Sequence, residues 1–262
     1  MRRILALASV VWLDMLRRKD IYVLAGLLLA SLAALMSFRI FSLGGLVSHV
    51  KELGLLGAWL LAWILAVMTS VRQIPQEESR GTIFSLLARP VTRFEFLAGK
   101  WLGTWSLVGV ATAAFYVMVW IMAALRGGAF APTVLAQALA LHLGFLAVVI
   151  AAGLLFSTRL NADAAGALTA LSSLASFALV PRIPEIIAYA AGWRQIALLI
   201  FYHVLPRLEI FDLRQRLVHN WGPAPAGAFF LVLAYAAVET ALLLLLAWLL
   251  YRNKRFSRTS LL

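Results

Sequence analysis

The sequence EESRGTIFSLLARPVTRFEFLAGK spans Glu77–Lys100 and is the longest polar interruption in the N-terminal half of a very apolar chain. Its first half places apolar residues on one helical face, and Pro90 ends that helix. Thr92 then predicts an N-cap, and Glu95 three residues later completes a capping box. The stretch therefore predicts a short amphipathic helix, a proline corner and a second, capped helix.

The rest of the chain is too apolar for a soluble protein. It has 262 residues, of which 63% are hydrophobic and 13% are charged, whereas soluble domains have about 45–50% apolar and about 25% charged residues. The apolar residues form long unbroken runs rather than the alternating segments of a membrane β-barrel. The composition predicts an all-α integral membrane protein.

The positive net charge of +12 does not indicate a nucleic-acid partner in this setting. The Lys and Arg residues cluster where the apolar runs end, so they predict membrane topology and contacts with anionic lipids. The sequence contains no cysteine, which excludes disulfides and thiolate metal sites. The four histidines are scattered without metal-ligand spacing, and we assign no metal site.

The apolar runs predict six transmembrane helices. Before them, residues 1–19 form a predicted interfacial helix, and after the fifth helix comes an outer-face segment, 181–227, with a re-entrant element as the alternative to surface helices. The chain ends in a basic tail, 252–262. The predicted spans are residues 21–38, 55–71, 96–125, 132–156, 162–180 and 228–251.

The distribution of positive charge predicts the orientation. With six spans, most of the 23 Lys and Arg residues fall on the side that holds both termini and the 72–95 loop. The positive-inside rule makes that side cytoplasmic. We therefore expect a multi-pass protein of the cytoplasmic (inner) membrane with both termini in the cytoplasm.

The organising stretch resembles the cytoplasmic loop of ABC-2-type transporter permeases. In that family the loop holds the coupling helix, here residues 76–90, which docks on a separate ABC ATPase subunit. The resemblance also implies an ATP-driven exporter with two permease copies, as a homodimer or a pair of permeases. It rests on Glu77, Gly81, Thr82, Ile83, Leu86, Leu87, Ala88, Arg89, Pro90, Val91, Arg93, Glu95, Phe96, Gly99 and Lys100.

On this interpretation the chain is the non-catalytic permease subunit. Gly99-Lys100 lacks the first glycine and the Ser or Thr of a Walker A loop, so we expect ATP hydrolysis in the partner and no catalytic residue or cofactor in this chain. Membrane lipids are the other expected partner, and the substrate is unspecified. The residues predicted to couple to the ATPase are Glu77, Glu78, Arg80, Gly81, Thr82, Arg89, Pro90 and Arg93.

Two polar residues lie midway along predicted spans. Glu239 is in the last span and His142 is in the fourth, and both spans run in the same direction at similar depth. The sequence allows a Glu239–His142 pair or a contact of Glu239 with Tyr235 or Thr240. Such a group is either an element of the substrate pathway or an interhelical hydrogen bond.

Two alternative functions stay open. The chain is alternatively a non-transporting membrane scaffold subunit, or a membrane-embedded enzyme that uses Glu239 and His142. The small-residue motif Gly99-x-x-x-Gly103 lies at the membrane edge, where we expect local helix packing rather than a dimer contact.

Overall fold

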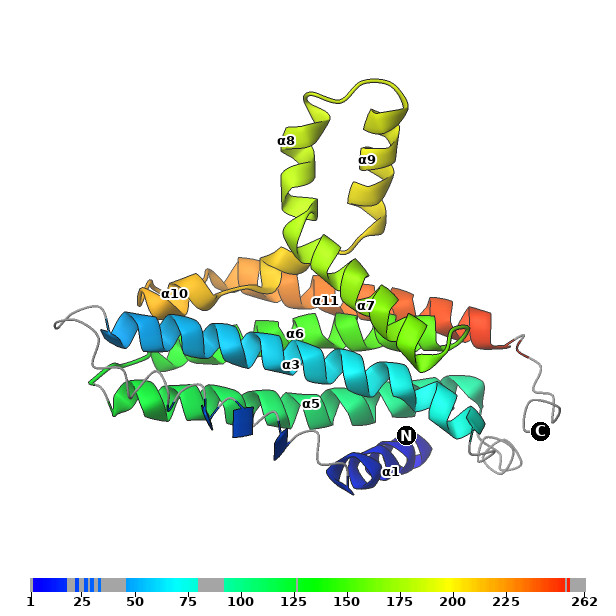
Figure 1. The fold of residues 1–262 in the computed structure, drawn as a ribbon, viewed down its shortest axis with the longest axis horizontal. Coiled ribbons are helices and arrows are strands. Elements are labelled where there is room, and N and C mark those ends of the chain that lie inside the picture. The colour runs from blue at the N-terminus through cyan, green and yellow to red at the C-terminus, as the bar shows by residue number, and fades with distance from the viewer. Residues whose placement is uncertain are drawn as a thin grey trace.

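The computed structural model describes residues 2–17, 22–23, 26–27, 29–30, 33, 46–79, 92–125, 127–252 and 254. Within these residues all regular secondary structure is helical (Figure 1). The elements are α1 (Arg2–Arg17), α3 (Leu46–Ser79), α5 (Arg93–Ala124), α6 (Pro132–Ser157), α7 (Ala162–Ala178), η1 (Val180–Arg182), α8 (Ile183–Ile187), α9 (Trp193–Val204), η2 (Leu208–Phe211), α10 (Arg214–Val218) and α11 (Ala226–Arg252).

Five segments of the described chain are long and apolar enough to cross a membrane. They are Ser48–Ser79, Arg93–Ala124, Pro132–Ser157, Ala162–Ile187 and Ala226–Arg252, which correspond to the predicted second to sixth spans. The predicted first span, 21–38, falls mostly outside the described residues. The all-α membrane fold is thus confirmed, and the count of six spans stays a prediction.

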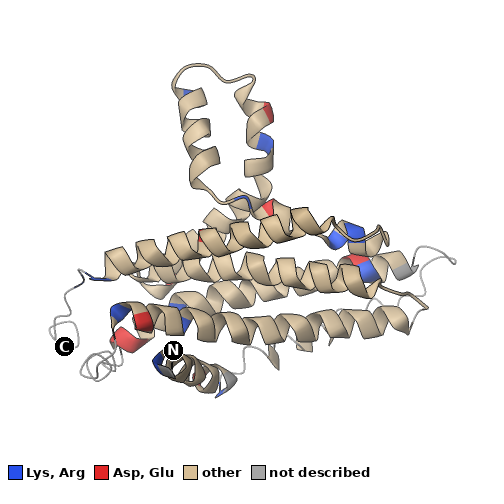
Figure 2. Cartoon of the chain, turned by 180° about the vertical axis from the view of Figure 1, so that it is seen from behind, with Lys and Arg blue, Asp and Glu red and all other residues tan. Residues whose placement is uncertain are grey.

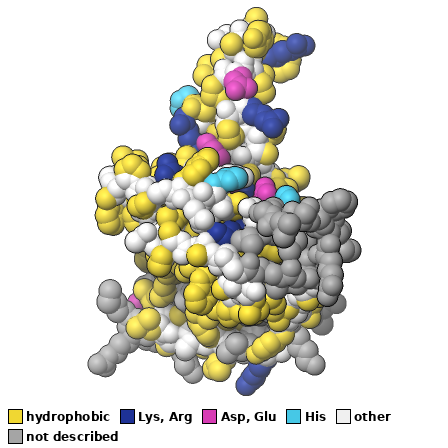
Figure 3. Space-filling model, turned by 90° about the vertical axis from the view of Figure 1, so that its left-hand side faces the viewer, with side chains coloured by type: hydrophobic (Ala, Val, Ile, Leu, Met, Phe, Trp, Pro, Cys, Tyr) yellow, Lys and Arg dark blue, Asp and Glu magenta, His cyan; other side chains and the backbone are white. Residues whose placement is uncertain are grey.

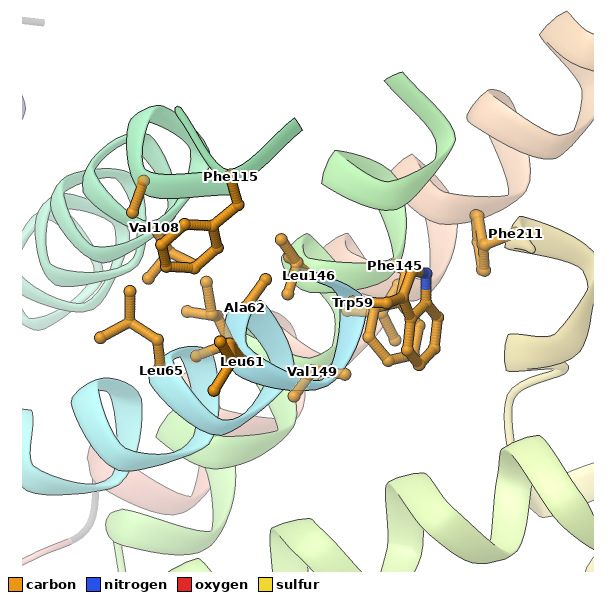
Figure 4. Close-up of a cluster of buried hydrophobic side chains, with 14 of the residues drawn as sticks. Trp59, Leu61, Ala62, Leu65, Val108, Phe115, Phe145, Leu146, Val149 and Phe211 are labelled. Carbon is orange, nitrogen blue, oxygen red and sulfur yellow. The ribbon is translucent and has the colours of Figure 1, made fainter. Parts of the chain in front are cut away.

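The core of the bundle lies where α3 packs on both α5 and α6. Trp59 of α3 contacts Phe145 of α6 with ring centroids 4.2 Å apart. Further along α3, Leu65 is fully buried opposite Phe115 of α5 (Figure 4). Because α3, α5 and α6 are each apolar on several faces, they bury one another and leave the remaining helices at the periphery.

The predicted capping box at the start of α5 is confirmed. The Thr92 hydroxyl accepts from the Glu95 N–H (3.2 Å), and the Glu95 carboxylate accepts from the Thr92 N–H (2.8 Å), which is a complete capping box. Asn161 caps α7 through the Ala164 N–H, and Pro132 occupies the first turn of α6. These local devices position the start of each helix independently of the packing.

Replacing the cap residue gives a first testable prediction. We expect Thr92→Val to lower the free energy of unfolding by about 1 kcal/mol, because the N–H of Glu95 loses its acceptor. Thermal unfolding in maltoside micelles measures the change. Thr133→Val is the matched control, since Thr133 is exposed in the first turn of α6, and an equal loss in both variants would contradict a capping role.

The helix α3 is longer than its predicted span of 55–71. It begins at Leu46 and passes through Pro75 to Ser79, so one intrahelical hydrogen bond is missing at the proline without ending the helix. Residues 76–79 are therefore the last turn of α3 and not the start of a separate helix. The rest of the predicted coupling helix, residues 80–90, lies outside the described residues.

The segment 181–227 contains an unexpected arrangement. The helices α8 and α9 form a hairpin that projects from the side of the bundle, and η2 and α10 then return to it (Figure 1). Both α7 and α10 pack on α3 and α6, in opposite halves of the bundle (Figure 1). One peripheral position of the bundle is thus built from two helices, with the hairpin inserted where they meet.

Candidate functional site

Charged side chains gather toward the two ends of the bundle (Figure 2). We name one of them the α3–α5 end, where α3 and α11 finish, α5 begins and α6 turns into α7. It contains three of the predicted coupling residues, Glu77, Glu78 and Arg93. The other five lie outside the described residues: Arg80, Gly81, Thr82, Arg89 and Pro90.

Glu77 forms the most buried ion pair of this end. Its Oε1 accepts from Nζ of Lys100 at 2.7 Å, and the exposed fractions of the two side chains are 18% and 6%. The ammonium group also lies 5.8 Å from the centroid of the Phe96 ring. Removing one partner from a buried pair leaves a desolvated charge, so this pair fixes the end of α3 against the second turn of α5.

Glu78 connects α3 to the C-terminal end of α11. Its Oε1 accepts from Nζ of Lys254 at 2.6 Å, and the same nitrogen donates to the carbonyl oxygen of Thr158 at 2.9 Å. Both side chains of this pair keep about a quarter of their surface exposed, at 28% and 23%. Lys254 therefore joins three parts of the bundle, namely α3, the α6–α7 turn and the residues after α11.

Arg93 lies in the first turn of α5 and caps the end of α11. Its Nη1 donates to three carbonyl oxygens, those of Tyr251 (2.6 Å), Arg252 (2.8 Å) and Lys254 (3.1 Å). The last carbonyls of a helix have no intrahelical partner and carry partial negative charge, so a guanidinium satisfies both requirements. Arg159 of the α6–α7 turn donates to the Leu250 carbonyl in the same way.

These contacts determine what residues 80–91 are attached to. The segment leaves α3 directly after Glu78 and enters α5 directly before Arg93. On both sides of it, charged side chains connect to α11, and on the first side Glu77 connects to α5. The described residues that flank the segment on both sides thus connect α3, α5 and α11 to one another.

The helix α1 packs along the beginning of α5. A Cβ atom at Gly103 would lie 2.9 Å from the Ala8 backbone, and one at Gly99 would lie 2.6 Å from Cβ of Leu7. Trp12 adds a hydrogen bond to Ser106 of α5 at 2.8 Å. The Gly99-x-x-x-Gly103 motif thus serves local helix packing, as predicted, and it holds α1 beside the α3–α5 end.

The two polar residues predicted within the spans lie in different surroundings. His142 is fully buried and stacks on Trp59 at 5.2 Å, and neither ring nitrogen has a hydrogen-bond partner among the described residues. Glu239 lies beside Tyr235 in a separate cavity. The predicted Glu239–His142 pair is not formed, because the two residues face different neighbours, whereas the alternative contact with Tyr235 is present.

Sequence reasoning missed a polar group near His142. The Arg214 guanidinium makes a bidentate contact with Asp212 (2.7–3.1 Å) and lies 5.1 Å from the centroid of the Trp59 ring. The sequence assigns Asp212 and Arg214 only to the outer-face segment, 181–227. No periodicity connects positions 212 and 214 to residue 59, because their contact depends on the return of the chain after the α8–α9 hairpin. Within the described residues no group of three His, Asp or Glu side chains has metal-binding geometry.

Comparison with protein families identifies the chain. Residues 8–255 match the family described as ABC-2 family transporter protein. The chain belongs to the ABC-2 transporter family. A search of curated proteins gives no match. ABC-2 permeases are membrane components of transporters, are generally not catalytic themselves and generally pair with an ABC ATPase subunit, so this chain is a membrane transporter component.

Proposed function

We propose that this ABC-2 chain is the permease subunit of an ATP-driven exporter in the cytoplasmic membrane. A separate ABC ATPase subunit docks on residues 76–90, and two permease chains form the membrane part. The α3–α5 end faces the cytoplasm together with both termini, in agreement with the positive-inside rule. The observation that carries the proposal is the attachment of Glu77, Glu78 and Arg93 to α5 and α11.

This attachment gives a physical route from the ATPase to the membrane helices. Movement of the docked ATPase displaces residues 80–91, and the ion pairs pass that displacement to α3, α5 and α11. A transporter needs two conformations that bind its partner differently, because a ligand shifts an equilibrium only by its differential affinity. In this chain the nucleotide state of the ATPase supplies that difference, and it reaches α11, the least buried of the candidate spans of the described chain, through Arg93 and Lys254.

Cross-linking and ATPase assays test the proposal. We expect cysteines introduced at Arg80 and Arg89 to cross-link to the ABC ATPase subunit that pairs with this chain, in a sequence that has no native cysteine. We also expect the reconstituted chain to stimulate ATP hydrolysis and to move substrate across vesicles. Cross-links without transport would identify a scaffold subunit, and residues 80 and 89 labelled only from outside the cell would overturn the proposed orientation.

Glu78 provides a prediction specific to coupling. We expect Glu78→Gln to reduce stimulation of the ATPase by about two- to five-fold, corresponding to a partly exposed ion pair worth less than about 1 kcal/mol. Lys254→Gln has at least the same effect, because it also removes the bond to the Thr158 carbonyl, and the double variant loses no more than Lys254→Gln, because both single variants remove the same ion pair.

The matched control is Glu52→Gln, an exposed carboxylate of α3 at the opposite end of the bundle. It leaves stimulation unchanged. Strictly additive losses from Glu78→Gln and Lys254→Gln would contradict transmission through this pair.

A further inference from the structure

Two cavities lie beneath residues 204–208, where the α8–α9 hairpin rejoins the bundle. The first, the polar cavity, has a volume of about 410 Å³ and is lined by Tyr202, His203, Leu205, Arg207, Tyr235 and Glu239, among others. The second, the apolar cavity, has a volume of about 270 Å³, and its lining includes Val148, Ala152, Ser172, Ser176, Leu205 and Leu246. Leu205 is a wall of both, so a polar and an apolar compartment adjoin.

Glu239 is the one acidic side chain in the lining of the polar cavity, which also includes the basic Arg207. Glu239 is the only acidic or basic residue between Ala226 and Tyr251 and is only partly buried. Its neighbour is the Tyr235 hydroxyl, and no Lys or Arg of the described chain forms an ion pair with it. A carboxylate in the middle of a membrane-spanning helix is costly and is kept where it faces a cavity or a functional partner.

The other polar groups of the cavity are already engaged. The Arg207 guanidinium lies 4.5 Å from the centroid of the Tyr202 ring and contacts its hydroxyl. The backbone N–H of Arg207 donates to the Tyr235 hydroxyl at 2.8 Å. Nearby, burial raises the pKa of the Glu209 carboxyl above its usual range. Arg207 keeps its charge but is directed onto Tyr202 rather than paired with Glu239, so Glu239 is the group of this lining that attracts a cation from outside the chain.

The apolar cavity has the properties of a site for a hydrocarbon chain. Its walls come from α6, α7, α11 and the 204–208 segment. The Ser176 hydroxyl on this wall is buried and has no hydrogen-bond partner among the described residues. Above it, the hairpin presents apolar side chains between charged ones at its surface (Figure 3), and the exposed apolar side chains include Ile200 and Val204 of α9, next to the cavity.

We propose that the two cavities together bind an amphiphile that has a cationic headgroup and one alkyl chain. The headgroup lies against Glu239 and Tyr235, and the chain passes Leu205 into the apolar cavity. Specificity comes from charge, because an anionic headgroup placed beside Glu239 is repelled and a neutral one leaves the carboxylate without compensation. That the amphiphile is cargo depends on the proposed transport function, whereas its binding does not.

Photolabelling in neutral maltoside micelles tests the binding. The probe is tetradecyltrimethylammonium with a diazirine near the end of its chain, and the matched probe is the tetradecyl sulfate with the same diazirine. We expect saturable labelling of the 172–176 and 204–208 segments by the ammonium probe, displaced by unmodified tetradecyltrimethylammonium and not by tetradecyl sulfate. Equal labelling by both probes, or labelling of α9 alone, would overturn the proposal.

Variants locate the charge recognition. We expect Glu239→Gln to weaken binding of the ammonium probe at least about ten-fold, whereas Glu185→Gln, an exposed carboxylate on α8, leaves it unchanged. Leu205→Trp fills the shared wall and abolishes labelling of 172–176, which provides a second test if Glu239→Gln does not fold. Unchanged binding of the ammonium probe to either Glu239→Gln or Leu205→Trp would overturn the proposed site.

ATPase stimulation without any amphiphile is measured in parallel. If the chain stimulates the ATPase but takes no probe, only the amphiphile site fails. If the probe binds but no ATPase docks, the site stands and the transport function fails.

Discussion

Replacement of Glu77 by methionine is expected to lower the free energy of unfolding by about 2–3 kcal/mol, somewhat below the full loss for a completely buried pair, because Glu77 keeps 18% of its side chain exposed. The reason is the position of Lys100, whose side chain is 6% exposed. Without the carboxylate its ammonium group stays desolvated. In thermal unfolding the loss corresponds to a transition roughly 5–10 °C lower for a chain of this size.

The double variant Glu77→Met/Lys100→Met separates this effect from simple loss of a contact. Replacing both partners of a buried pair with apolar side chains of similar length is often neutral, so we expect the double variant to recover most of the stability lost in Glu77→Met. Glu78→Gln is the matched control, because its pair with Lys254 is more exposed, and we expect a change below about 1 kcal/mol. A double variant less stable than Glu77→Met would contradict the buried-charge explanation.

We expect the Glu77–Lys100 pair to contribute to ATPase stimulation as well as to stability. The double variant restores folding without restoring an electrostatic connection between α3 and α5. We therefore expect it to stay deficient in ATPase stimulation even where its thermal transition is normal. Stability and coupling then depend on the pair in different ways, which a purely structural ion pair would not show.

The parts of the fold that could be predicted from sequence depend on local chemistry. Thr92, Asn161 and Pro132 define helix starts through their own hydrogen bonds or ring geometry, so a short window of sequence contains the information. The apolar runs likewise predicted the second to sixth spans. The predicted second span ends at residue 71, whereas α3 continues through Pro75 to Ser79, because a proline in a long, well-packed helix costs one hydrogen bond, which the contacts of α3 with α5 and α6 offset.

The parts that could not be predicted depend on contacts between distant residues. Lys254 lies 176 positions after Glu78, and no motif connects them. The sequence predicts that Glu239 and His142 lie at a similar depth in the membrane. It does not determine whether they lie on facing sides of their helices. A small error in the predicted rotation of a helix is enough to separate such a pair. No periodicity in the sequence predicts the α8–α9 hairpin, whose residues Tyr202 and His203 line the cavity beside Glu239.

Substitution of Gly103 by leucine is expected to detach α1 from α5. A Cβ atom at this position would lie 2.9 Å from the Cα and carbonyl oxygen of Ala8 and 2.8 Å from Cβ of Val11, and backbone atoms cannot move aside as a flexible side chain can. Forced overpacking of this kind usually costs about 1–3 kcal/mol, and displacing α1 avoids it. The hydrogen bond from Trp12 to Ser106 is lost with the contact.

Thiol accessibility measures this detachment directly, because the chain has no cysteine. Val11 is buried against α5, so the single cysteine of Val11→Cys should resist maleimide labelling in the native background and become labelled with Gly103→Leu. The control is Gly109→Leu, a glycine of the same helix where the added Cβ approaches only a flexible Leu143 methyl group at 3.2 Å. Because α1 packs beside the first turns of α5, where Arg93 and Lys100 lie, detachment should also weaken ATPase stimulation. Continued protection of the Val11→Cys thiol in the Gly103→Leu variant would show that α1 stays on α5 by other contacts and does not depend on this close approach.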